Sequence, residues 1–328
     1  MIQPRHILNA REYIICTAGN SLFCISTETG SFVELEVGSI VRSLAFTQST
    51  PEVDMVLSNF ADENTAAANS SDLNGAEAGS HTQSTNQELL KDKSVIAHTS
   101  QDTTKSLRYY HCSLLLAAVT DTKQLIVWQC VNGKFTKITQ TLATKRANTV
   151  LFSPDCTSLL IGDKQGDVLI YAFVQNSKVG FQTPKLLLGH VSILTALTWS
   201  HDQKSLVSAD RDEKVRVNKY PGSFVIEWFL TGHEEFVTKL CLLPSSSSMS
   251  GTGSSNVEKI EIATENEHCL VSGGGDAFLF VWNYKSGQLL QKVAMFGEIT
   301  GVLSFESTCI TSISIDATSC LMAVTLEK

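Results

Sequence analysis

The chain has 328 residues, of which 43% are hydrophobic, so it is long enough to bury a substantial core. Its formal net charge of −8 argues against a protein that grips nucleic acid alone, because neutralising phosphates requires a basic surface. No apolar run reaches membrane-spanning length, and the N-terminus lacks the features of a signal peptide. We therefore expect a soluble intracellular protein with no membrane partner.

The first part of the chain alternates short apolar runs with turn residues. Residues 13–36 predict three strands, which make up most of a first small sheet. A second sheet begins at residues 41–46 and resumes at 111–129. Between them, residues 47–109 are rich in Ser, Thr, Asn, Ala and acidic residues, a composition that cannot bury enough surface to offset its ordering entropy. We expect this insertion to be disordered.

The same strand rhythm continues to the C-terminus. Further strand groups are predicted at about 144–174, 188–229 and 232–292. The last of these contains a loop at 245–256 made almost entirely of Ser, Gly and Thr, which is a flexible linker composition. A sixth group begins near Val302. We interpret residues 1–328 as one domain built from repeated small sheets.

Two of the strand groups share a pattern of residues. Each opens with Gly-His, at 189–190 and 232–233, continues with an apolar run, and then reads Ser-x-x-x-Asp before an alternating strand. This pattern is typical of the blades of a WD-repeat β-propeller, in which each blade is a four-stranded antiparallel sheet. The predicted fold class is therefore all-β, a WD-repeat propeller.

The marked residues of each copy can form one hydrogen-bonded group, here called a tetrad. A buried imidazole needs partners for both ring nitrogens, and Asp and Ser can supply them. The prediction for one copy is His233, Ser272, Asp276 and Trp282. For the other it is His190, Ser208 and Asp212, with Asn218 in the place of the tryptophan.

Two catalytic interpretations of these residues compete with the structural one. His, Asp and Ser together also suggest a hydrolase triad, and two histidines beside nine cysteines suggest a metal site. The histidines recur at equivalent positions of successive blades, however, and the cysteines form no Cys-x-x-Cys pair. We therefore predict structural tetrads, with no catalytic residue and no metal.

One turn carries an unusual density of charge. Residues 210–216 (Asp-Arg-Asp-Glu-Lys-Val-Arg) hold six charged residues in seven positions, where ordinary WD repeats have Ser, Thr or Gly. This run, with Gly-His-x-Ser at 189–192 and Gly-His-x-Glu-Phe-Val at 232–237, resembles the non-catalytic WD-repeat subunit of the tRNA (guanine-N7)-methyltransferase complex. Residues 162–168 resemble the preceding blade of that family. The resemblance extends from about 145 to 292.

The resemblance implies a fold, a function and a site. Seven blades are expected in that family, so five blades and a fragment imply a C-terminally truncated chain. The chain would be no enzyme: it would bind and stabilise the catalytic methyltransferase subunit as a heterodimer, supporting N7 methylation of a guanine in the tRNA variable loop. S-adenosylmethionine is expected on the catalytic partner, with no cofactor here and tRNA bound through the complex. The resemblance also implies location in the nucleus, with the cytoplasm as a further location.

The partner-binding residues implied by the resemblance lie in the charged turn, defined as residues 211–216. They are Arg211, Glu213, Lys214 and Arg216, with Lys164 and Asp163 as weaker candidates in the preceding blade. Charges of both signs on one rigid turn suit a complementary protein patch better than phosphate. The alternative for the turn is a solvated salt-bridge cluster. The alternative for the whole chain is a generic scaffold or adaptor of ubiquitin-ligase or chromatin type, and an enzyme built on a propeller is a third possibility.

Overall fold

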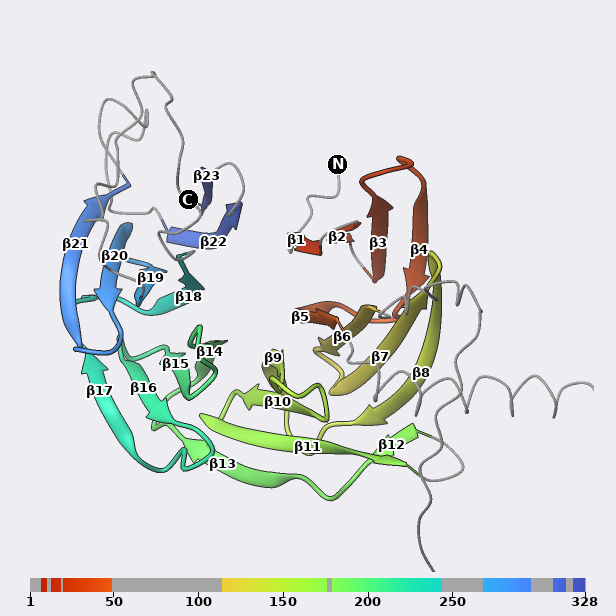
Figure 1. Ribbon diagram of the computed structural model, residues 1–328, viewed down its shortest axis with the longest axis horizontal. Coiled ribbons are helices and arrows are strands. Elements are labelled where there is room, and N and C mark those ends of the chain that lie inside the picture. Colours follow the sequence, from red (N-terminus) through yellow and green to blue (C-terminus); the bar gives the residue numbers. More distant parts are fainter. Residues whose placement is uncertain are drawn as a thin grey trace, which may run out of the picture.

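The computed structural model describes residues 7–10, 13–18, 20–48, 114–175, 179–243, 268–295, 309–316 and 321–327. These residues form antiparallel sheets that surround a common centre as an open ring (Figure 1). Within these ranges no helix is long and apolar enough to span a membrane. The predicted insertion lies outside the described residues except at positions 47 and 48, which end a strand, and the predicted loop at 245–256 lies outside them entirely.

Each sheet is a run of consecutive strands, ordered from the centre of the ring outward. The first sheet contains β1 (Ile7–Ala10), β2 (Tyr13–Ala18), β3 (Ser21–Ser26) and β4 (Phe32–Glu36). The second contains β5 (Val41–Gln48), β6 (Leu114–Thr120), β7 (Gln124–Val131) and β8 (Lys134–Leu142). The third contains β9 (Ala147–Phe152), β10 (Ser158–Asp163), β11 (Asp167–Gln175), β12 (Val179–Phe181) and β13 (Lys185–Gly189).

The remaining sheets follow the same order. The fourth contains β14 (Leu194–Trp199), β15 (Ser205–Asp210), β16 (Val215–Lys219) and β17 (Ile226–Leu230). The fifth contains β18 (Val237–Leu242), β19 (Cys269–Gly274), β20 (Phe278–Asn283) and β21 (Gln288–Ala294). The sixth pairs β22 (Cys309–Asp316) with β23 (Leu321–Glu327). These are the blades of a WD-repeat propeller, and the predicted fold class is confirmed.

Three sheets contain strands that sequence reasoning missed. In the second sheet, β8 pairs with β7 beyond the predicted end at residue 129. β1 completes the first sheet on its inner side, pairing with β2. In the third sheet the outermost position is shared, because β12 pairs with the end of β11 and β13 pairs with its beginning. Since β13 ends at Gly189, the chain leaves the outer edge of the third sheet directly at His190. The third blade therefore continues past the predicted end at 174.

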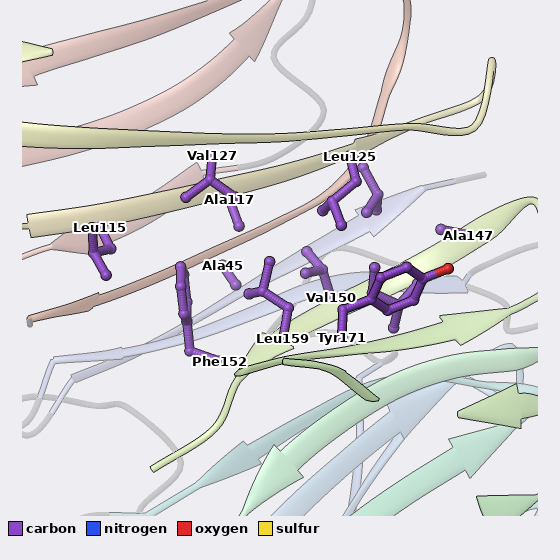
Figure 2. Close-up of a cluster of buried hydrophobic side chains, with 12 residues drawn as sticks. Ala45, Leu115, Ala117, Leu125, Val127, Ala147, Val150, Phe152, Leu159 and Tyr171 are labelled. Carbon is purple, nitrogen blue, oxygen red and sulfur yellow. The ribbon is translucent and has the colours of Figure 1, made fainter. Parts of the chain in front are cut away.

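The core lies between the sheets rather than inside any one of them. The second strands β10, β15 and β19 are buried along their whole length, which places apolar side chains on both faces. Figure 2 shows the contact between the second and third sheets, where Leu115 and Val127 face Phe152 and Leu159. Equivalent clusters fill the other four contacts between neighbouring sheets. Stacked twisted sheets of this kind bury alternate residues toward each neighbour.

The innermost strands carry a shared irregularity. In β5, β9, β14, β18 and β22 the pairing register shifts near the start of the strand, inserting an extra residue at each bulge: Arg42, Asn148, Thr195, Thr238 and Thr311. Two of these side chains join neighbouring sheets, since Asn148 donates to the carbonyl of Leu194 and Thr238 donates to that of Ile310. A bulge bends a strand and re-aims its side chains, and here it links successive blades around the centre.

Candidate functional site

The tetrad of the fifth sheet is assembled from three elements. His233, in the segment before β18, contacts Asp276 through Nδ1 at 2.9 Å and Ser272 Oγ through Nε2 at 2.8 Å. Trp282 of β20 donates its indole N–H to the same Ser272 Oγ at 2.8 Å. The structure brings together all four residues that the sequence predicts here.

The network determines where the proton lies on the imidazole. An indole N–H can only donate, so Ser272 Oγ accepts from Trp282 and turns its own hydrogen toward Nε2 of His233. The ring proton is therefore on Nδ1 and points at the Asp276 carboxylate. Every polar atom at the centre of this group has a partner, which removes the cost of burying it. The same Asp-His-Ser order occurs in catalytic triads, but Ser272 is completely buried, so a substrate cannot reach its hydroxyl.

The tetrad of the fourth sheet has the same logic with one different member. Nε2 of His190 contacts Ser208 Oγ at 2.8 Å, and Asn218 Nδ2 donates to that oxygen at 3.1 Å, so Asn218 takes the place of the tryptophan. Nδ1 of His190 contacts Asp210 at 2.8 Å. The acid of this tetrad is therefore Asp210, and the prediction of Asp212 is wrong.

The reason lies in the turn between the second and third strands of each sheet, here called the second turn. It has five residues, at 120–124, 163–167, 210–214 and 274–278, and the fourth of them has a positive φ of 56° to 95° in every case. The first residue of the fourth sheet's turn is Asp210, which is close enough to reach His190. In the fifth sheet that position is Gly274, so the acid comes from the third residue, Asp276. The spacing between the serine and the aspartates in the sequence therefore does not tell whether the first or the third residue of the turn is the tetrad acid.

Because Asp210 serves the tetrad, Asp212 is left at the surface. It is exposed and accepts a hydrogen bond from Ser192 Oγ at 2.7 Å. The turn beneath it is rigid, since Asp210 Oδ1 accepts the backbone amides of Asp212 and Lys214. The tetrad and these amide bonds together hold the charged turn in one conformation.

Burial and hydrogen bonding set the charges of this pair. Burial lowers the pKa of His190, so the imidazole is neutral at pH 7. Burial alone would raise the pKa of Asp210, but the hydrogen bonds from His190 and from the turn amides outweigh it and lower that pKa. A carboxylate accepting from a neutral imidazole N–H is consistent with both directions.

The predicted partner-binding residues in the charged turn differ in the exposure of their side chains and in the contacts that these side chains make. Arg211 and Glu213 are exposed, and Glu213 adopts the left-handed conformation with a φ of 68°. Lys214 is half-buried, and its Nζ donates to the backbone oxygen of Asp212 at 3.2 Å. These three side chains carry charges of both signs on the rigid turn.

Arg216 is in a different situation. Its guanidinium donates to the carbonyl of Gly189 at 3.0 Å and lies over the ring of Phe229, 5.5 Å from the centroid. Val215 and Val217 on either side of it pack toward the fifth sheet. As alternation along β16 predicts, Arg216 faces the opposite way, toward the third sheet. Its principal contacts are internal, which sequence reasoning missed because Phe229 lies on another strand.

The two predicted partner-binding residues in the second turn of the third sheet, Asp163 and Lys164, also differ in burial and contacts. Asp163 is buried, with a side chain only 1% exposed, and its Oδ1 accepts the amides of Gln165 and Asp167. It is the counterpart of Asp210 and is unavailable to a partner, which corrects that prediction. Lys164, the counterpart of Arg211, is half-buried, and it is anchored through its backbone amide to Arg146.

Comparisons with known proteins agree with the sequence resemblance. The family model described as the tRNA methyltransferase TRM82 WD40 domain matches residues 174–258 and 254–325. The tRNA (guanine-N(7)-)-methyltransferase non-catalytic subunit wuho of Drosophila willistoni is 34% identical over 179 residues, which are 54% of this chain and 36% of the relative. The subunit wuho of Drosophila mojavensis is 38% identical over 147 residues, 44% of this chain and 32% of the relative.

A fungal relative gives the same result. The non-catalytic subunit TRM82 of Eremothecium gossypii is 33% identical over 192 residues, which are 57% of this chain and 38% of the relative. The matched region thus spans between 32% and 38% of the length of these curated relatives. The resemblance to the non-catalytic WD-repeat subunits of tRNA (guanine-N7)-methyltransferase is confirmed.

Proposed function

We propose that this chain, a relative of the non-catalytic WD-repeat subunits of tRNA (guanine-N7)-methyltransferase, binds and stabilises a catalytic methyltransferase subunit. Its contribution is positioning, and the methyl donor S-adenosylmethionine binds the partner. The pair acts on tRNA in the nucleus, a location that rests on the resemblance alone. The names of the relatives support a non-catalytic role.

The observation that carries the docking proposal is the state of the charged turn. Arg211, Glu213 and Lys214 project from a turn whose backbone is held by Asp210, and none of the three forms a side-chain ion pair within the described residues. A rigid surface with charges of both signs selects a partner with the complementary pattern. The alternative of an internal salt-bridge cluster would need these side chains to pair with one another.

The internal contacts of Arg216 refine the residue set. The guanidinium of Arg216 is held by the carbonyl of Gly189 and the ring of Phe229. We therefore infer that Arg216 stabilises the turn and does not present its charge to a partner. Reversing its charge would disturb the packing of β16 against β17. Arg211 and Lys214 are therefore the cations whose reversal tests docking with the least damage to the fold.

The test is co-purification of this chain with the methyltransferase subunit from the same source, followed by a tRNA guanine-N7 methylation assay. We expect the wild type to bind and to increase methylation, and Arg211→Glu/Lys214→Glu to lose both while its circular dichroism is unchanged. A folded wild type that binds no methyltransferase would sink the proposal in favour of a generic scaffold or adaptor. That alternative would also leave binding undiminished in the double variant.

A further inference from the structure

The centre of the ring contains a cavity of about 260 Å³. It lies where the innermost strands β5, β9, β14, β18 and β22 converge (Figure 1). Among the residues that the structure describes, its lining includes two cationic side chains, Arg42 and Lys239, and no acidic one. The chain has a formal net charge of −8, whereas the charged residues named in this lining are both cations.

Lys239 is the more informative of the two cations. It follows directly after the bulge of β18, which places its side chain between β18 and the neighbouring β22. Among the described residues its ammonium has neither a hydrogen bond nor an ion pair. Burial lowers the pKa of Lys239, and no carboxylate in the described part of the chain offsets that effect. An unpaired amine in a cavity costs free energy that a bound anion would recover.

Arg42 lies on another side of the cavity, and its charge is only partly compensated. It is the extra residue at the bulge of β5, and its guanidinium forms a long ion pair with Asp121, with Nη2 and Oδ2 3.9 Å apart. Its Nε is buried without a hydrogen-bond partner. By contrast, Asn148 and Thr195, at the equivalent bulges of β9 and β14, donate to the carbonyls of Leu194 and Ala209. The polar side chains of those two bulges are satisfied within the fold. Arg42 keeps an unpartnered Nε beside its long ion pair, and Lys239 has no hydrogen bond or ion pair among the described residues.

Hydroxyl groups add further donors to the lining. Ser43 Oγ accepts only a long bond from the amide of Val150, at 3.4 Å, which leaves its own hydrogen free to donate. Ser312 of β22 also lines the cavity. Cations and hydroxyl donors around one space are the donor set for a small oxygen-rich anion. A water occupies about 30 Å³ in the liquid, so the cavity has room for phosphate with several waters.

We propose that the central cavity is a binding site for a small oxyanion, with Lys239 as its principal counter-ion and Arg42 as a second one. The site is independent of the docking surface, which lies at the second turn of the fourth sheet. Phosphate and a dicarboxylate such as malonate share the required chemistry, and the sodium salt of each serves as a probe.

The experiment titrates sodium phosphate or sodium malonate into the full chain and follows the melting temperature and the heat of binding, with sodium chloride at equal ionic strength as the reference. We expect a saturable response to at least one of the two oxyanions and none to chloride. Lys239→Met should weaken binding at least about tenfold, as expected for losing the principal charged donor. Lys239→Arg should retain most of the affinity, because it keeps a cationic donor.

The matched control is Lys219→Met, which removes an exposed lysine at the end of β16 and should bind like the wild type. If Lys239→Met does not fold, the ε-methylene resonances of Lys239 in the wild type should shift on adding the oxyanion but not on adding chloride. A wild type without a saturable response to either oxyanion overturns the proposal. Equal affinity in Lys239→Met, or unshifted Lys239 resonances at saturating oxyanion, overturns it as well.

Discussion

The fourth and fifth sheets build the same tetrad from different positions of the same turn. In the fifth sheet the acid is the third residue of the second turn, Asp276, and the first is Gly274. In the fourth sheet the acid is the first residue, Asp210, which leaves the third, Asp212, at the surface. The difference teaches that one structural role can be filled from two sequence positions. In the fourth sheet this choice leaves Asp212 exposed on a rigid turn, which is the surface that we propose for docking.

The largest effect is expected where the tetrad also carries core packing. Trp282 is buried, stacks on Phe280 at 5.5 Å between ring centroids, and donates to Ser272. Trp282→Ala should lower the free energy of unfolding by about 3–5 kcal/mol, measured by urea denaturation. Trp228→Ala is the matched control, because Trp228 lies on the outer strand β17 and is 42% exposed. Equal losses in the two variants would contradict a structural role for the fifth-sheet tetrad.

The next prediction separates the two acids of the fourth sheet. Asp210→Asn should lower the free energy of unfolding by about 1–3 kcal/mol, because His190 and the turn amides lose a charged acceptor. Asp212→Asn removes the same charge at an exposed position two residues later. This substitution should change the free energy of unfolding by less than about 0.5 kcal/mol. The same urea experiment measures both. The reverse ranking would restore Asp212 as the tetrad acid.

A smaller effect is expected from pH. An unfolded histidine binds a proton near pH 6.5, whereas the lowered pKa keeps His190 neutral at that pH in the folded protein. The unfolded state therefore binds more protons on acidification, and stability should fall from pH 7 toward pH 5.5. The lowered pKa of Asp210 acts in the same direction at lower pH. His190→Gln should show a shallower loss over this interval, and a wild type as stable at pH 5.5 as at pH 7 would contradict the assignment.

The order of strands and turns could be predicted from the sequence, because the alternation of apolar and polar residues and the presence of turn residues are local signals. It located the blades, the fifth-sheet tetrad and the substitution of Asn218 for tryptophan. The identity of the acid beside His190 was not readable, because residues 210 and 212 are both aspartates and only the path of the turn decides between them. The burial of Asp163 and the contact between Arg216 and Phe229 depend on neighbouring strands, which spacing along the chain does not reveal.

The most direct test of the docking proposal compares the equivalent turns of the third and fourth sheets. The dissociation constant for the catalytic methyltransferase subunit would be measured for the wild type, for Arg211→Glu/Lys214→Glu and for Lys164→Glu, each with an unchanged urea midpoint. The account predicts that the double reversal weakens binding at least about tenfold, as is typical for charges at an interface. It predicts a smaller loss for Lys164→Glu. Unchanged affinity in the double reversal, or an equal loss from Lys164→Glu, would contradict docking through the charged turn.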